Sequence, residues 1–101
     1  MTERAWKRAE RGIARIVGGE RVPVNGRGDL PDVLSSRFSV EVKNRALPEW
    51  VLHAVQQAEI GKCETDKDYH MAVIHYPGTQ FGSSLALLRI KDLMRILEGG
   101  A

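Results

Sequence analysis

The sequence contains a single cysteine, Cys63, among its 101 residues. One cysteine cannot form an internal disulfide, and it has no thiolate partner for a zinc site. The three histidines, His53, His70 and His75, lack the convergent spacing of a histidine–metal site, so we interpret them as structural. A disulfide framework and a zinc centre are therefore not expected.

Long hydrophobic runs are also missing. No apolar stretch approaches the roughly 18 residues that a membrane span requires. Residues 1–8 lack the apolar segment that is typical of a signal peptide. We expect a cytoplasmic protein, since a reducing compartment also suits the lone cysteine.

Neither positive nor negative charge dominates the composition, since the formal net charge is only +2. The charges are unevenly distributed, however. Residues 1–45 hold ten Lys/Arg and six Asp/Glu, which gives +4, and residues 46–101 hold five and seven, which gives −2. A basic first half suits a polyanionic partner such as DNA. The alternative is an ordinary charged surface.

The spacing of apolar residues predicts an α/β protein that forms one domain over residues 1–101. Each helix is predicted from a period near 3.6 residues, and each strand from alternation or a short apolar run. We expect helices at residues 3–17, 48–60 and 91–97. We expect strands at residues 20–24, 31–34, 37–43, 71–76 and 85–90.

The first of these helices is amphipathic. Its predicted buried stripe consists of Trp6, Ala9, Ile13, Ile16 and Val17. Four arginines, at positions 4, 8, 11 and 15, gather on the opposite face. Guanidinium groups match phosphate oxygens, and the candidate DNA contacts along the chain are Arg8, Arg11, Arg15, Arg27 and Arg45. Taken singly, each arginine also fits a solvated surface position.

The strand expected at residues 37–43 contains the residues best suited to chemistry. Glu41 and Lys43 lie two apart, so both side chains project from one face, about 6–7 Å from each other. Asp32 lies in the preceding strand, which can form a hairpin that brings its carboxylate beside Glu41. Two carboxylates suit Mg²⁺, and an ammonium group can polarise the attacking water or offset charge on a phosphate. The alternative is a hairpin with a charged solvent face.

The pair Pro31-Asp32, followed nine positions later by Glu41-Val42-Lys43, resembles the signature of the PD-(D/E)XK nuclease superfamily. Within it, the chain is similar to archaeal-type Holliday junction resolvases, which begin with a helix that carries a glutamate, here Glu10. The resemblance implies a restriction-endonuclease-like core, with a central mixed β-sheet flanked by helices in the order α-β-β-β-α-β-β-α.

The resemblance also implies roles for individual residues. Asp32, Glu41, Glu10 and the Val42 backbone carbonyl would bind Mg²⁺, with Mn²⁺ as a possible substitute. Glu10 fits equally well as a surface helix glutamate paired with a nearby arginine. Gln57 would support the site, although it also fits the rim of the core. These resolvases usually carry a serine before the motif aspartate, which this chain lacks between residues 20 and 34, so a phosphate contact would fall to Asn25 or Arg27.

The function implied by the resemblance is a Mg²⁺-dependent endonuclease that makes paired nicks in four-way junctions during DNA recombination and repair. One alternative is a nicking, flap or repair nuclease of the same superfamily. Another is a DNA-binding module without catalysis, against which the complete set of Asp32, Glu41 and Lys43 argues.

We also expect a homodimer. One catalytic set cuts one strand at a time, and two cuts on opposing strands require a two-fold pair of sites. The residues proposed for the subunit contact are Trp50, Leu93, Met94 and Leu97, which alternatively complete a small core.

Overall fold

The computed structural model describes residues 4–23 and 30–99. The chain divides into two compact units, residues 1–46 and residues 47–101. Among the helices described, none has the length and apolar character needed to cross a lipid bilayer.

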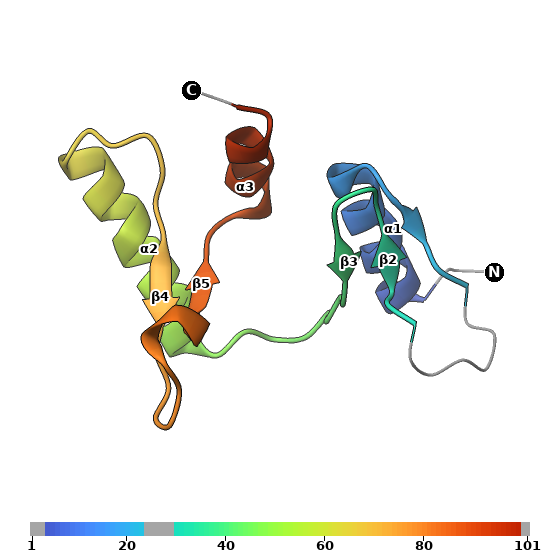
Figure 1. Ribbon diagram of the computed structural model, residues 1–101, viewed down its shortest axis with the longest axis horizontal. Helices are drawn as coiled ribbons and strands as arrows, with labels where there is room; N and C mark the ends of the chain where they lie inside the picture. Colours follow the sequence, from blue (N-terminus) through green and yellow to red (C-terminus); the bar gives the residue numbers. More distant parts are fainter. Residues whose placement is uncertain (1–3, 24–29, 100–101) are drawn as a thin grey trace. The chain divides into compact units, whose positions relative to one another are not determined.

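The first unit is a helix packed on a small antiparallel sheet (Figure 1). Helix α1 spans Ala5–Val17, and the strands are β1 (Glu20–Arg21), β2 (Val33–Leu34) and β3 (Ser39–Val40), in the order β1-β2-β3. The helix packs against β1 and β2. Val33, at the centre of the sheet, is completely buried, so the β2–β3 hairpin forms the base on which Asp32 is held.

The corner between α1 and β1 depends on two glycines. Gly18 takes the left-handed conformation (φ 70°) that ends a helix, and the Gly19 N–H donates to the Ala14 carbonyl oxygen at 2.8 Å. A Cβ atom at Gly19 would overlap the Leu34 carbonyl oxygen and lie 2.8 Å from the Leu34 carbonyl carbon. Only glycine therefore allows the corner to pass so close to β2.

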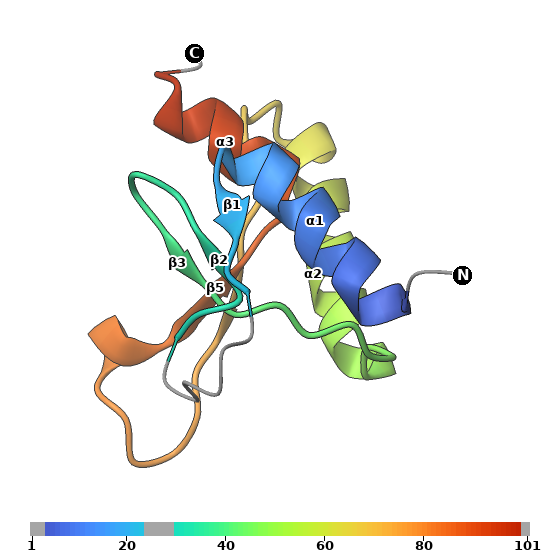
Figure 2. The ribbon, with the colours of Figure 1, turned by 90° about the vertical axis from the view of Figure 1, so that its right-hand side faces the viewer.

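Figure 2 shows β2 and β3 joined as a hairpin. A serine tightens its turn. Leu34 pairs with Ser39, and Val33 pairs with Val40. The Ser35 hydroxyl accepts a hydrogen bond from the Phe38 N–H at 2.9 Å, and the Ser35 N–H donates to the Phe38 carbonyl oxygen at 2.9 Å. Such side-chain bonds to the backbone favour a turn and fix its register.

The second unit joins two helices and a two-stranded sheet. It contains α2 (Glu49–Glu64), β4 (Ala72–Ile74), the 3-10 turn η1 (Phe81–Ser83), β5 (Leu85–Leu87) and α3 (Ile90–Leu97). Strands β4 and β5 are antiparallel, and β4 contacts α2. Its buried side chains, each below 9% exposure, are those of Val55, His70, Ala72 and Asp92.

Contacts between polar side chains join elements of the second unit. The His70 ring and the Asp92 carboxylate are both buried, with Nδ1 3.7 Å from Oδ2. The burial of His70 agrees with a structural role. The Arg89 guanidinium donates two hydrogen bonds to the Glu59 carboxylate, at 3.0 and 3.2 Å, and so ties α2 to the residue before α3.

The Glu59–Arg89 pair predicts an acid-sensitive contribution to stability. The hydrogen bond from Arg89 lowers the pKa of Glu59 below its ordinary value of 4.5. A lowered pKa stabilises the fold above the unfolded value, and that contribution disappears as the pH falls through the folded value. Glu59→Gln should therefore be less stable than the parent at about pH 7 in urea unfolding, and the difference should shrink at about pH 3. Glu64→Gln, an exposed carboxylate on the same helix, should show no such convergence.

The structure confirms a small α/β protein with three helices, and its strands form two small antiparallel sheets within the described residues. The single mixed sheet of a restriction-endonuclease-like core stays a prediction. The regular strands are all shorter than expected, and two boundaries bear most on the site and on α2. Helix α2 continues to Glu64 rather than ending near residue 60, and regular pairing of β3 stops at Val40 rather than reaching Lys43.

Candidate functional site

Asp32 is the structural centre of the candidate site. Its carbonyl oxygen accepts from the Val22 N–H at 2.9 Å, which links it to the chain just after β1. Its own N–H donates to the Val40 carbonyl oxygen at 3.0 Å, and its Oδ2 accepts from the Val42 N–H at 2.8 Å. Asp32 is thus hydrogen-bonded to the segment after β1 and to the end of β3. Its carboxylate is held at the segment that contains Glu41 and Lys43.

The backbone becomes irregular at this point. The register of β2 and β3, continued by one residue beyond Val33 and Val40, would set Asp32 opposite Glu41. The Asp32 N–H bonds instead to Val40, and the Asp32 side chain takes the N–H of Val42. The Asp32 carboxylate thereby takes the place of a backbone carbonyl as the acceptor for the Val42 N–H. This bond fixes the spacing between Asp32 and the segment that contains Glu41 and Lys43.

Glu41 and Lys43 keep the alternation predicted from the sequence, although they lie beyond the regular part of β3. Both residues are exposed, and Val42 between them is half-buried. Asp32 is half-buried. The structure therefore brings Asp32 against the Glu41–Lys43 segment and leaves the glutamate and the lysine exposed to solvent.

The donor set suits Mg²⁺ as a site with two carboxylates. Within residues 4–23 and 30–99, no group of three or more His, Cys, Asp or Glu side chains is placed to hold a metal ion. Mg²⁺ is usually bound through one or two carboxylates, with water and substrate phosphates as its other ligands. Asp32 and Glu41 would have to supply that minimum, and the bond from Val42 engages only Oδ2 of Asp32.

Glu10 has another partner. It is buried, and its Oε1 accepts a hydrogen bond from Nε of Arg21 at 2.6 Å. The same guanidinium lies over the Trp6 ring, 5.4 Å from its centroid. Glu10 is therefore paired with an arginine, as one of its two interpretations expected. The pair is largely buried rather than at the surface, and it joins α1 to β1. Arg21 went unnoticed in the sequence because no periodicity links it to Glu10.

The candidate DNA-contacting arginines that the structure describes are all at the surface. Arg8, Arg11 and Arg15 are exposed on α1, and Arg45 is exposed in the segment before α2. Asn25 and Arg27 lie outside the described residues. Exposed arginines on one helix can contact phosphate oxygens.

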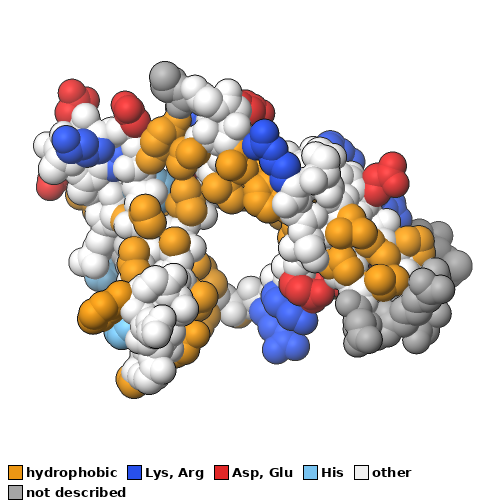
Figure 3. Space-filling model, viewed as in Figure 1, with side chains coloured by type: hydrophobic (Ala, Val, Ile, Leu, Met, Phe, Trp, Pro, Cys, Tyr) orange, Lys and Arg blue, Asp and Glu red, His pale blue; other side chains and the backbone are white. Residues whose placement is uncertain are grey.

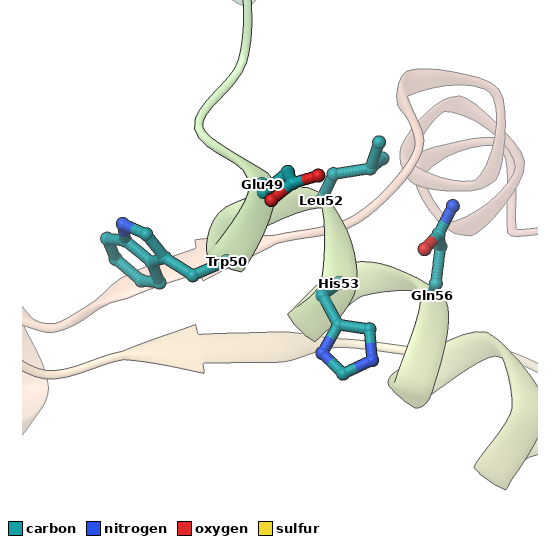
Figure 4. Close-up of a pocket in the computed structure, with 5 residues that line it drawn as sticks. All are labelled: Glu49, Trp50, Leu52, His53 and Gln56. Carbon is teal, nitrogen blue, oxygen red and sulfur yellow. The ribbon is translucent and has the colours of Figure 1, made fainter.

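Gln57, expected to support the site, is exposed on α2 in the second unit. The first turns of this helix also line a shallow pocket, formed by Glu49, Trp50, Leu52, His53 and Gln56 (Figure 4). Trp50 is 63% exposed and extends from the helix start. Neither the pocket nor its tryptophan was singled out as a ligand site from the sequence.

Comparison with known proteins gives no match to a family model, to a curated protein or to a solved structure. The likeness to the PD-(D/E)XK superfamily thus depends on the motif residues themselves.

Proposed function

We propose that this chain is a metal-dependent DNA endonuclease of the PD-(D/E)XK type, and that its substrate is a four-way junction. One observation carries the proposal. The Asp32 carboxylate accepts the Val42 N–H at 2.8 Å, so the aspartate is anchored to the backbone between Glu41 and Lys43. The proposal includes the restriction-endonuclease-like core, with a central mixed sheet flanked by helices.

The three motif side chains divide the chemistry of phosphodiester hydrolysis between them. Asp32 and Glu41 would hold Mg²⁺, or Mn²⁺ in its place, together with the Val42 carbonyl oxygen. When bound, the ion supplies Lewis-acid stabilisation of negative charge on the phosphate. Lys43 orients the attacking water and offsets charge that grows on the phosphate oxygens. Water adds to phosphorus, the bond from phosphorus to one sugar oxygen breaks, and the leaving oxygen takes up a proton.

The test of this function compares two DNA substrates. The protein and Mg²⁺ are incubated with a four-way junction and with a linear duplex of the same arm sequence. We expect paired nicks near the branch point of the junction and little cutting of the duplex. Equal cutting of both would favour a nicking or repair nuclease, and binding without any cutting would favour a DNA-binding module.

The arginine stripe of α1 predicts a change in salt dependence. Replacing Arg8, Arg11 and Arg15 together with alanine should weaken binding to junction and duplex alike. If each arginine contacts one phosphate, the slope of log K against log salt should become shallower by about three units. A matched change of Lys67 and Lys91, which are exposed in the second unit, should leave the slope unaltered. An unchanged slope in the triple variant would show that the stripe does not contact DNA.

The homodimer is part of the same proposal. Hydrophobic side chains lie at the surface of both units (Figure 3). Of the residues expected at the subunit contact, Trp50 is 63% exposed, whereas Leu93, Met94 and Leu97 are half-buried. Sedimentation at micromolar concentration should show a dimer, and Trp50→Ala should shift it toward monomer. Wild-type protein that remains monomeric on junction DNA would contradict paired cutting by a two-fold pair of sites.

A further inference from the structure

The connection between β4 and β5 presents an aromatic side chain to solvent. Phe81, at the start of η1, is 85% exposed. The connection projects beyond the ends of the two strands (Figure 1). A phenylalanine in this setting offers a large apolar face on which another flat group can stack.

The Phe81 ring is held in place by its neighbours. The His75 ring lies against it, with centroids 4.9 Å apart and planes inclined at 42°. A hydrogen bond of 2.9 Å joins His75 Nδ1 to the Ser84 hydroxyl, and the Ser84 N–H donates to the Phe81 carbonyl oxygen at 3.1 Å. The exposed ring is thus supported by a second ring and by a closed turn, so stacking on it requires little additional ordering.

The lack of charged residues in this part of the sequence limits the classes of molecule that the Phe81 ring suits. Residues 69–88 contain no Lys, Arg, Asp or Glu. The hairpin has no carboxylates of its own that would repel a polyanion. Without lysine or arginine, it lacks the basic residues that accompany apolar side chains on a membrane-binding surface. A flat, uncharged aromatic face suits the face of a nucleobase, while phosphates are bound elsewhere on the protein.

We propose that Phe81, supported by His75, stacks on an unpaired or branch-point base of DNA. The inference depends on the proposed function and specifies its substrate. A base inside a linear duplex is covered on both faces by its neighbours, whereas a bulged base or a base at a branch point offers a free face. The β4–β5 connection would therefore distinguish branched or distorted DNA from regular duplex, and the arginine stripe of α1 would bind either form.

The test uses a duplex with one bulged 2-aminopurine, compared with the same sequence in which 2-aminopurine is paired. Ca²⁺ replaces Mg²⁺, so that binding proceeds with little cleavage. We expect the wild-type protein to quench the bulged fluorophore. Phe81→Ala should remove most of the quenching and lower the ratio of bulged to paired affinity by roughly 5- to 150-fold, the range expected for one base–aromatic stack.

Two further variants make the result specific. Phe81→Trp should restore both quenching and the affinity ratio. Met71→Ala, which removes another exposed apolar side chain of the same unit (59% exposed), should leave both unchanged. Quenching that survives in Phe81→Ala, an equal loss in Met71→Ala, or absence of DNA binding by the wild type would overturn the inference.

The outcome also separates this inference from the proposed function. Phe81-dependent quenching without cleavage in Mg²⁺ would retain base stacking and reject the nuclease. Cleavage with quenching that does not depend on Phe81 would retain the nuclease and reject base stacking.

Discussion

Asp32→Asn, Glu41→Gln and Lys43→Ala should each reduce Mg²⁺-dependent cleavage of a four-way junction by at least about 100-fold. Asp32→Asn and Glu41→Gln remove a negative charge proposed to hold the ion, and Lys43→Ala removes the cation proposed to stabilise the phosphate. Single-turnover cleavage rates measure the effect directly. Binding measured in Ca²⁺ should change far less, because the arginines of α1 are proposed to bind DNA.

The structure also indicates that these variants fold. An asparagine at position 32 keeps a side-chain oxygen that can accept the Val42 N–H, the bond that aspartate makes at 2.8 Å. Glu41 and Lys43 are exposed, so their replacement disturbs no packing. Glu20→Gln, the same isosteric change at an exposed position of β1, is the matched control and should cleave at the parental rate. Full activity in any motif variant would exclude that residue from the mechanism.

Gly19→Ala should destabilise the first unit by about 1–3 kcal/mol, the usual cost of forcing an additional methyl group into a filled space. The new Cβ would overlap the Leu34 carbonyl oxygen and lie 2.9 Å from the Ser35 Cβ. The two crowded atoms of Leu34, its carbonyl carbon and oxygen, belong to the backbone of β2. This strand cannot move aside without breaking its pairing with β1. Urea unfolding should show a lower midpoint.

Gly12→Ala is the matched control, and its expected sign is opposite. Gly12 lies within α1, and no described atom lies within 4 Å of a Cβ built there. Alanine at a helix interior is favoured over glycine by up to about 1 kcal/mol, so the midpoint should rise. Equal midpoints for Gly19→Ala and the parent would contradict the close approach of the α1–β1 corner to β2.

The limits of helices can be predicted from sequence better than the side that a helix buries. The period of apolar residues predicted α1 almost to its ends, yet Trp6 and Ile16 are 39% and 48% exposed. Val17 of the predicted stripe is buried as expected, and Glu10 and Ala14, which were not part of the stripe, are buried with it. A carboxylate becomes acceptable there because Arg21 neutralises it. That partner lies eleven residues away, on a strand whose position depends on the tertiary fold.

The residues of the candidate site were proposed from the sequence, but their geometry was not. Alternation predicts that Glu41 and Lys43 are exposed with Val42 less so, and their exposure follows that pattern. The early end of β3 could not be foreseen, since it follows from a side chain. Asp32 takes the N–H of Val42, which therefore does not bond to a backbone carbonyl of β2. Sequence patterns describe one element at a time, whereas this contact exists only after two elements have met.

The two tryptophans of the chain fall one in each unit, and their surroundings make intrinsic fluorescence selective for the first unit. Trp6 has the Lys7 ammonium and the Arg21 guanidinium each 5.4 Å from its ring centroid, whereas Trp50 is 63% exposed. Unfolding of the first unit removes Arg21 from the Trp6 ring and alters its emission, but in the monomer Trp50 already lies in water and changes little. Intrinsic fluorescence therefore follows the first unit, and far-ultraviolet circular dichroism follows the helices of both. Coincident melting curves from the two signals mean that the units unfold as one cooperative body, and separated curves mean that each unit is stable by itself.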